Sequence, residues 1–405
     1  MKTGISAGVI FVFIMVLLFQ SCRTTGVKDY KNEAVNVNAL QLLKESKFDE
    51  AFEVSGRRLD AVKNDSNALM INIISQYIVT VRNINTEMRY YNSLKWNDIT
   101  SDLYATFSNA DKNFREIENH LKILSKDKNF KFSFVPGELK IDWDGDGFIS
   151  ESEENMFSVE TDDEGNAVSP HNPEFTFDHS DVLWAQSYMN FHLAFLNVIS
   201  CFDYDDVIYL FKNSSSLDDM GTVTVKIRNK KDLVNAHGYF MKGFDLSEKT
   251  RLSVLSESDD DREWLPNPKQ KSCPLPLKMN KELFDKWKMF LFYLKELASG
   301  KTMLSFQSFF DNSWHPVKMT GGLDIKNMFL NSNDIHFNLK SLEQKYLLSG
   351  RSGNFDPLME ELFGKFYIYD KPESPLLKKL MEMKKDVESG MDTYAYKMKF
   401  LLWIN

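Results

Sequence analysis

The sequence predicts a mainly α-helical protein with a few short β-strands, and three patterns support this prediction. Apolar residues recur at alternating spacings of four and three along one segment, which is the pattern of a helix that buries one face. They are Leu103, Phe107, Ala110, Phe114, Ile117, Leu121 and Leu124. Residues 281–299 form a second predicted helix, with Asn280 as its N-cap and Gly300 as its stop signal. Alternating apolar and polar residues predict strands in two short runs, 130–134 and 223–227.

An N-terminal helical region is expected over residues 38–135. Residues 39–51 place a helix, a tight turn and a second helix as tetratricopeptide-type repeats do, and a further helix follows the break at 64–67. This pattern resembles one degenerate repeat and the start of a second. A generic helical hairpin fits it as well, so the prediction is of helical hairpins or a helical bundle.

Residues 166–405 are expected to form a larger, mainly helical C-terminal domain. An acidic, turn-rich linker at 161–172 comes before a predicted helix at 181–200. Apolar residues lie nearly all round that helix, which is typical of a core position. Shorter helical segments are expected between residues 339 and 404.

The first 21 residues have the pattern of a secretion signal peptide. Lys2 precedes an apolar run from Val9 to Phe19, about half of the ~20 residues that a membrane-spanning helix needs. Cys22 follows the small residue Ser21 at the end of this pattern.

This arrangement resembles the lipobox of bacterial lipoproteins, in which the cysteine is acylated. The resemblance implies a lipid anchor on Cys22, a tether over residues 22–37, and a location in the bacterial cell envelope, at the outer membrane or facing the periplasm. An ordinary signal peptide with an incidental cysteine is the alternative. In an exported chain Cys201 and Cys273 could form a disulfide, but nothing in the sequence brings them together, and buried or idle thiols are the alternative.

Composition excludes some classes of function. A chain of 405 residues with 43% apolar content can form one large or two medium folded units. Its net charge of −9 does not favour nucleic acid, which requires a basic surface. The common catalytic signatures G-x-S-x-G and H-E-x-x-H do not occur in the sequence.

Residues 142–153, within a predicted segment 136–165, have the pattern of a calcium-binding loop of the EF-hand type. Acidic residues occupy positions 1, 3, 5 and 12 of the loop, and Gly147 at position 6 allows the sharp turn that makes them converge. The predicted ligands are Asp142, Asp144, Asp146, the backbone carbonyl of Phe148, Ser150 directly or through a water, and both carboxylate oxygens of Glu153.

Oxygen ligands of this kind favour calcium over zinc, which prefers nitrogen and sulfur, and over magnesium, which requires tighter octahedral geometry. Ile149 at position 8 is expected to pack against the core. The segment before the loop is expected to be extended, where EF-hands usually have a helix. A solvated acidic loop without metal is the alternative.

Taken together with the segments Phe177–Trp184 and Glu263–Gln270, the loop resembles those of a group of uncharacterised bacterial exported lipoproteins with a central EF-hand-type calcium loop and degenerate tetratricopeptide-like helices. The resemblance covers residues 40–335. It implies calcium binding and an envelope location, and it carries no activity.

The sequence therefore predicts a calcium-binding envelope lipoprotein, a non-enzymatic scaffold or binding protein in which calcium orders the junction between two helical regions. A protein or peptide is the expected partner, besides calcium and the membrane that holds the lipid anchor. The alternative is an exported hydrolase with a structural calcium site. A pocket that gathers Asp178, His179 or His192 with acids such as Asp259 or Glu263 would favour that alternative.

Overall fold

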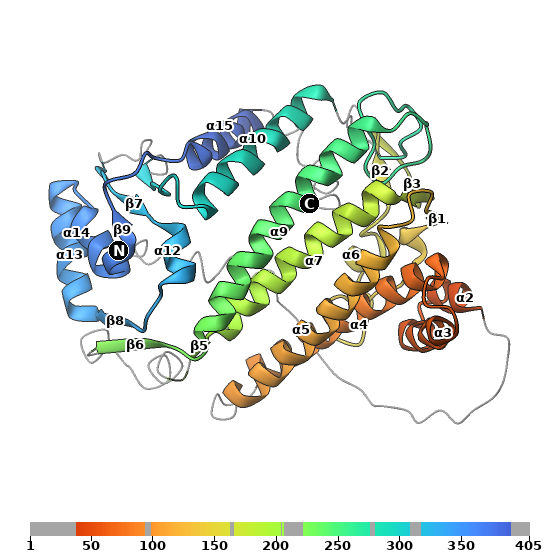
Figure 1. The fold of residues 1–405 in the computed structure, drawn as a ribbon, viewed down its shortest axis with the longest axis horizontal. Helices are drawn as coiled ribbons and strands as arrows, with labels where there is room; N and C mark the ends of the chain where they lie inside the picture. Colours follow the sequence, from red (N-terminus) through yellow and green to blue (C-terminus); the bar gives the residue numbers. More distant parts are fainter. Residues whose placement is uncertain are drawn as a thin grey trace. The chain divides into compact units, whose positions relative to one another are not determined.

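The computed structural model describes residues 38–93, 99–162, 166–203, 205, 222–275, 280–307 and 317–389. This part of the chain is mainly helical, with short strands in small sheets, as predicted (Figure 1). The described residues divide into two compact units: those from 38 to 160 with 169–179, and those in 161–168 and 180–389. Within the described ranges, no helix combines the length and apolar character that a membrane crossing requires. The predicted signal peptide, Cys22 and the tether lie outside the described residues.

The first unit begins with a series of antiparallel-type helical hairpins in which α3 packs on α4 and α4 packs on α5. The elements are α2 (Ala39–Lys44), α3 (Phe48–Ala61), α4 (Ser66–Ser93) and α5 (Ile99–Leu124). Asn38 caps α2 by accepting a hydrogen bond from the backbone N–H of Leu40 at 3.0 Å. Ser46 has a positive φ of 58° in the tight turn that follows. The predicted helix, turn and helix are confirmed, and the repeat assignment stays a prediction.

The apolar stripe of α5 is the centre of the first unit's core. Six of its predicted residues, from Phe107 to Leu124, are buried, and Leu103 is half-buried. The ring of Phe114 is stacked on the ring of Tyr77 from α4, with the centroids 6.1 Å apart. The spacing of apolar residues therefore predicted the buried face of this helix correctly.

A two-stranded sheet closes the long segment that contains the predicted metal loop. Strand β1 (Lys131–Phe134) pairs antiparallel with β4 (Phe175–Asp178), and Phe134 is opposite Phe175. The side chains of Phe130, Phe132 and Phe134 are buried, which confirms the alternation predicted for this run. The chain leaves the sheet after Phe134 and re-enters it at Phe175, directly opposite. Residues 135–174 therefore start and end beside each other.

The predicted acidic linker contains regular structure that the sequence analysis missed. The short strands β2 (Val159–Thr161) and β3 (Ala167–His171) pair in a two-stranded sheet. Asp162, just after β2, accepts hydrogen bonds from the backbone and side-chain amides of Asn166, just before β3, at 2.8 and 2.9 Å. The sequence analysis predicted an acidic, turn-rich linker at 161–172 and did not predict these strands, because acidic residues, Gly and Asn dominate the local pattern.

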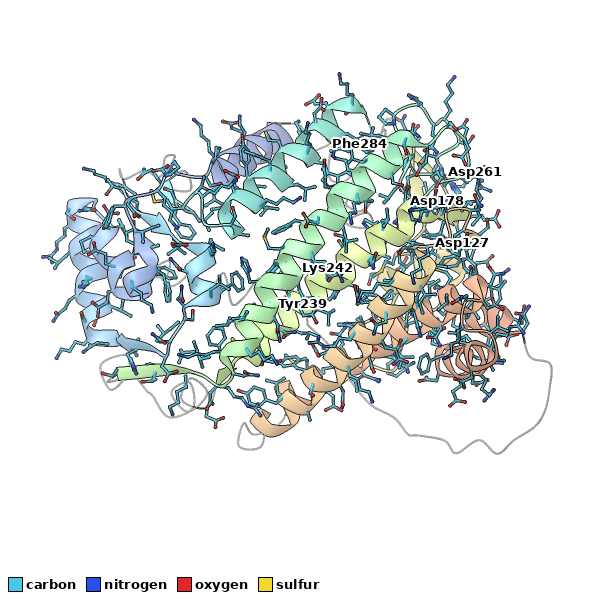
Figure 2. The ribbon with its side chains drawn as sticks, in the orientation of Figure 1. Asp127, Asp178, Tyr239, Lys242, Asp261 and Phe284 are labelled. Atoms are coloured by element: carbon cyan, nitrogen blue, oxygen red, sulfur yellow. The ribbon has the colours of Figure 1, made fainter. Side chains whose placement is uncertain are left out.

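The long helices α7 (His179–Ser200), α9 (Lys230–Ser256) and α10 (Lys281–Ala298) form the core of the second unit. Further along the chain, the described residues also form α12 (Ile325–Leu330), α13 (Leu339–Ser352), α14 (Asp356–Phe363) and α15 (Leu376–Ser389). Helices α7 and α9 approach closely at Gly243, where a Cβ would lie 2.5 Å from the ring of Phe191. Phe284 of α10 is almost completely buried (Figure 2). The predicted core position of the α7 segment is confirmed by buried residues on several of its faces, such as Val182, Leu193 and Ala194.

Short strands complete the second unit. One sheet has the order β5 (Phe202–Asp203), β6 (Thr222–Ile227), β8 (Ile335–Asn338), and β7 (Gly322–Leu323) pairs with β9 (Tyr367–Ile368). Strand β6 is the predicted strand at 223–227. The caps of α10 are also as predicted, because the Asn280 side chain accepts from Leu283 N–H at 2.9 Å and Gly300 has a φ of 73°. Short η2 (Pro136–Glu138) and η4 (Gly364–Phe366) are single 3₁₀ turns.

The two cysteines whose pairing the sequence left open are both free thiols. Burial raises the pKa of the Cys201 thiol to about 12, and burial also raises the pKa of the Cys273 thiol to about 12. Both side chains therefore stay protonated at neutral pH.

The contribution of Phe114 to the core can be tested by substitution, with an exposed phenylalanine as the control. Replacing Phe114, which is 1% exposed, with Ala leaves a cavity and should lower the free energy of unfolding by about 3–5 kcal/mol. Phe148 is 77% exposed, and Phe148→Ala should change it by less than about 0.5 kcal/mol. Urea denaturation measures both, and equal losses would contradict this description of the core.

Candidate metal site

Buried residues fix the chain just before the loop at residues 142–153. After η2, the side chains of Leu139 and Ile141 are buried, while the backbone N–H of Lys140 donates to the hydroxyl of Ser46 at 2.8 Å. Residues 139–141 are not helical, as predicted. The chain therefore reaches Asp142 from an anchored, extended segment.

Carboxylates at the start of the loop organise its backbone. Asp142 accepts hydrogen bonds from the N–H groups of Asp146 at 3.0 Å and Gly147 at 2.8 Å. Asp144 accepts from the same Asp146 N–H at 3.0 Å. This tight path uses left-handed conformations at Gly145 (φ 68°) and Gly147 (φ 83°), which glycine adopts without a Cβ clash.

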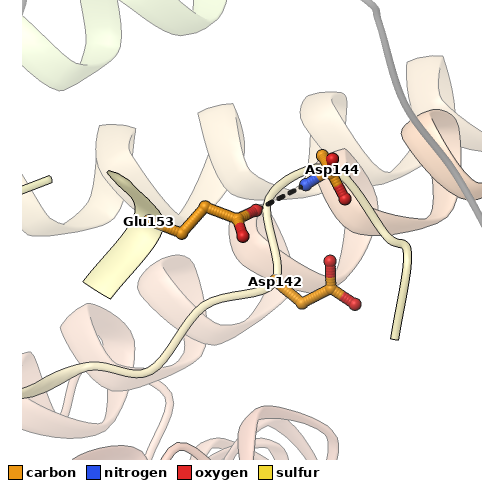
Figure 3. A group of neighbouring side chains, drawn as sticks. All are labelled: Asp142, Asp144 and Glu153. Atoms are coloured by element: carbon orange, nitrogen blue, oxygen red, sulfur yellow. Dashed lines mark hydrogen bonds between the residues drawn. The ribbon is translucent and has the colours of Figure 1, made fainter. Parts of the chain in front are cut away.

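Glu153 closes the other end of the loop. Its Oε1 accepts from the N–H of Asp144 at 3.0 Å (Figure 3), and its Oε2 accepts from the N–H and the hydroxyl of Ser150, each at 2.8 Å. Ser150 is also the N-cap of the short helix α6 (Glu151–Glu154), with a complete capping box. The helix start thus orients the last acidic side chain back toward the first two.

Three of the predicted ligands come together. One carboxylate oxygen each from Asp142, Asp144 and Glu153 can be chosen so that all lie within 4.8 Å of one another (Figure 3). Asp146 is not part of this group, and its Oδ2 lies 3.7 Å from Nη1 of Arg89. Oxygens at such separations are suited to a hard cation placed between them.

The carboxyl of Asp142 lies in surroundings that disfavour its charged form. Burial raises the pKa of the Asp142 carboxyl above its ordinary value, and the negative charges of Glu153 and Asp144 raise it further. Hydrogen bonds from the N–H groups of Gly147 and Gly145 act in the opposite direction. A bound cation would remove the repulsion between these carboxylates.

Helix α4 provides a platform for the loop that the sequence analysis missed. The side-chain amide of Asn85 donates to the carbonyl of Trp143 at 2.6 Å. One residue later, Thr86 lies so close to Gly145 that a Cβ there would be 2.5 Å from the Thr86 hydroxyl. One turn later, Arg89 approaches Asp144 at 3.3 Å. The loop motif does not include a helix 55 residues earlier in the chain. The only sequence signal for a close backbone approach at this point is Gly145 itself.

One expectation about the loop was wrong. Ile149 was expected to pack against the core, but its side chain is 41% exposed, next to the exposed ring of Phe148. The short α6 and the extended segment before the loop do not form the pair of long helices that would cover this position. The predicted contribution of Phe148 is through its backbone carbonyl, which does not depend on the exposed side chain.

A cavity of about 430 Å³ lies beside the loop in the first unit. Its walls include residues 137–140 just before the loop, Glu154, Asn155 and Ser158 just after it, and residues 170–172. Asn172 braces two of these walls, because its side chain accepts from the Ser158 hydroxyl at 2.7 Å and donates to the Gly137 carbonyl at 2.9 Å.

The pocket that would favour a hydrolase is not this cavity. None of Asp178, His179, His192, Asp259 and Glu263 is among its lining residues. His179 instead contacts the Lys128 ammonium at 2.5 Å, and burial together with this positive charge lowers its pKa. The ring of His192 contacts the carbonyl of Tyr188 at 2.9 Å in its own helix. Both contacts fit structural roles.

In the second unit, the loop after α9 brings Asp259, Asp261 and Glu263 together, with carboxylate oxygens within 4.8 Å of one another (Figure 2 labels Asp261). The neighbouring Asp260 accepts from the backbone N–H groups of Lys271 and Ser272, which fixes the loop and lowers the pKa of its carboxyl. This group lacks the spacing of the loop at residues 142–153.

Comparison with protein-family models, with curated proteins and with solved structures gives no match for this chain. The interpretation of the site therefore depends on its own residues.

The close approach of Gly145 to α4 can be tested against Gly147. Each Gly→Ala substitution forces a side chain into a left-handed conformation, at a cost of about 1–2 kcal/mol. Only at Gly145 would the new Cβ also meet Thr86, whereas at Gly147 nothing lies within 4 Å. In EDTA, Gly145→Ala should therefore lower the free energy of unfolding by about 1–3 kcal/mol more than Gly147→Ala. Equal losses in urea denaturation would show that the loop does not rest on α4 as described.

Proposed function

We propose that this chain is a calcium-binding protein that holds one calcium ion in residues 142–153. The observation that carries the proposal is the convergence of Asp142, Asp144 and Glu153, which the loop spacing requires and whose oxygens lie within 4.8 Å of one another. Asp146, the Phe148 carbonyl and Ser150 complete the set. All of these ligands offer oxygen, the donor that calcium prefers.

The proposed role of the ion is to order the loop and its flanks. The loop joins a segment anchored in the first unit to the strand β2, at which the chain first passes from one unit to the other. Calcium would fix the position of residues 137–140 relative to Glu154, Asn155 and Ser158, which line the same 430 Å³ cavity. Binding of calcium would also stabilise the folded state by mass action, by about 2.7 kcal/mol at a hundred times the dissociation constant.

This arrangement supports a non-enzymatic scaffold or binding protein. The cavity walls carry hydrogen-bonding groups of both kinds, such as Lys140, Glu154 and Asn155, which suits a polar protein or peptide segment. Because the walls flank the loop directly, calcium would control whether the cavity has a fixed shape. From the sequence pattern at Cys22, we also propose that the chain is anchored by lipid in the bacterial cell envelope.

Calcium binding can be tested by removing the negative charge of Glu153 while keeping its place in the capping box. Glu153→Gln retains a residue that forms capping boxes but loses the negative charge and one accepting oxygen. By isothermal titration calorimetry, the chain from residue 23 onward should bind one calcium, with a dissociation constant on the order of 10⁻⁴ M. Glu153→Gln should weaken binding at least about ten-fold, since every 1.4 kcal/mol is tenfold.

The neighbouring residue gives a matched control. Glu154 makes only a long contact of 3.9 Å to Lys140, and its side chain is 60% exposed. Glu154→Gln should keep the calcium affinity of the unsubstituted chain and its rise in melting temperature with calcium. Absence of any binding at 10 mM calcium, or equal behaviour of the two variants, would refute the proposed site.

The lipid anchor has a separate test. In a bacterial host supplied with labelled palmitate, the full chain should become labelled and Cys22→Ser should not. Cys201→Ser serves as the control, because Cys201 is buried and would not be acylated. Unchanged labelling of Cys22→Ser, or no labelling of the full chain, would exclude the anchor.

A further inference from the structure

We propose that Arg89 of helix α4 sets the calcium affinity of the loop by competing with the ion for the carboxylates of Asp144 and Asp146. This inference rests on the proposed calcium site. It assigns a role to a residue that lies outside the loop and outside its sequence motif.

The contacts of Arg89 place a guanidinium directly beside two of the proposed ligands. Its Nη2 lies 3.3 Å from Oδ2 of Asp144, and its Nη1 lies 3.5 Å from Oδ1 of the same carboxylate. The same Nη1 lies 3.7 Å from Oδ2 of Asp146. A planar guanidinium can face two carboxylates in this way because its N–H groups form a fixed fork.

Both oxygens of Asp146 already have partners in the loop. Its Oδ1 accepts from the backbone N–H of Phe148 at 2.8 Å, and its Oδ2 lies 3.7 Å from Arg89. Asp146 is also the one acidic ligand outside the convergent group of Asp142, Asp144 and Glu153. A calcium ion that bound Oδ2 of Asp146 would compete with the guanidinium for that oxygen.

Arg89 also opposes the ion through its charge. A divalent cation held by Asp144 would lie within a few ångströms of the guanidinium, where like charges repel even in a partly solvated site. The Arg89 side chain is 29% exposed, so water does not fully screen this repulsion. Both effects act in the same direction, and each makes calcium binding weaker than the four acidic ligands alone would give.

Two contacts of α4 place Arg89 beside the loop. The side-chain amide of Asn85 donates to the carbonyl of Trp143, and Thr86 packs against Gly145, on the same helix within one turn of Arg89. The helix position from which the guanidinium reaches the loop is therefore fixed. The guanidinium functions as a built-in counterion in the metal-free loop, with which calcium would compete for Asp146.

The test measures calcium affinity in charge-removing and charge-keeping variants. Arg89→Gln should bind calcium about ten-fold more tightly than the unsubstituted chain, and Arg89→Lys, which keeps the charge, should stay within about three-fold of it. Isothermal titration calorimetry at 0.05 M and 0.5 M KCl gives the affinities. The gain for Arg89→Gln should shrink at high salt because the ion atmosphere screens the repulsion.

Arg82 offers a matched control on the same helix. Its side chain is 31% exposed and pairs with Asp49 at 2.8 Å, away from the loop. Arg82→Gln should leave the calcium affinity unchanged. In EDTA, the melting temperatures of both Gln variants should lie within about 3 °C of the unsubstituted chain, since ion pairs that water still reaches contribute little to stability.

The outcomes separate this inference from the proposed site. If the unsubstituted chain binds one calcium but Arg89→Gln binds no more tightly than Arg82→Gln, the role of Arg89 is refuted while the site remains. Weaker binding by Arg89→Gln would likewise refute it, and would show that the guanidinium helps to preform the loop. If no variant binds calcium, the proposed site fails and the inference fails with it.

Discussion

The close packing of the loop backbone on helix α4 is the constraint on which the candidate site depends. Gly145 lies against Thr86 where no side chain would fit, and Asn85 holds the carbonyl of Trp143 beside it. With the backbone fixed there, the N–H groups of Asp146 and Gly147 point toward the carboxylate of Asp142, and the N–H of Asp144 points toward Glu153. A loop of acidic residues in solvent would have no reason to hold several like charges within 4.8 Å.

Different kinds of interaction hold the two ends of this arrangement. Before the loop, burial of Leu139 and Ile141 anchors an extended segment, which replaces the helix that usually enters such loops. After the loop, the capping box of Ser150 and Glu153 begins a helix of only four residues. The acidic side chains are thus positioned mainly by hydrogen bonds to backbone N–H groups, and less by long flanking helices. The exposed side chain of Ile149 is a direct result, because no second helix covers it.

Local patterns in the sequence predicted the features that depend on residues close together in the chain. The spacing of Phe107, Phe114 and Leu121 predicted a buried helix face, and alternation at Phe130–Phe134 predicted a strand, because each pattern reflects one periodic element facing one core. The D-x-D-x-D-G spacing predicted a convergence of four acidic side chains, of which Asp142, Asp144 and Glu153 come together and Asp146 does not. Arg89 and Asn85 could not be predicted, since they are brought to the loop by the packing of α4, and nothing in their own sequence context marks them. The strands β2 and β3 were missed because each is short and borders a turn whose residues dominate the local pattern.

The pairing of Phe134 with Phe175 has a consequence for how the segment between them relates to the rest of the chain. Because its two ends are adjacent in an antiparallel ladder, residues 135–174 are topologically an insertion into a β-hairpin. A short turn could join β1 to β4 without disturbing the register of Phe132 and Phe177. Another hairpin would offer two strand ends at the same spacing of about 5 Å, so the strands alone place no limit on moving this stretch of chain. Helix α4 does place one, because a transplanted segment 135–174 would leave behind Asn85 and Thr86, against which the loop backbone packs.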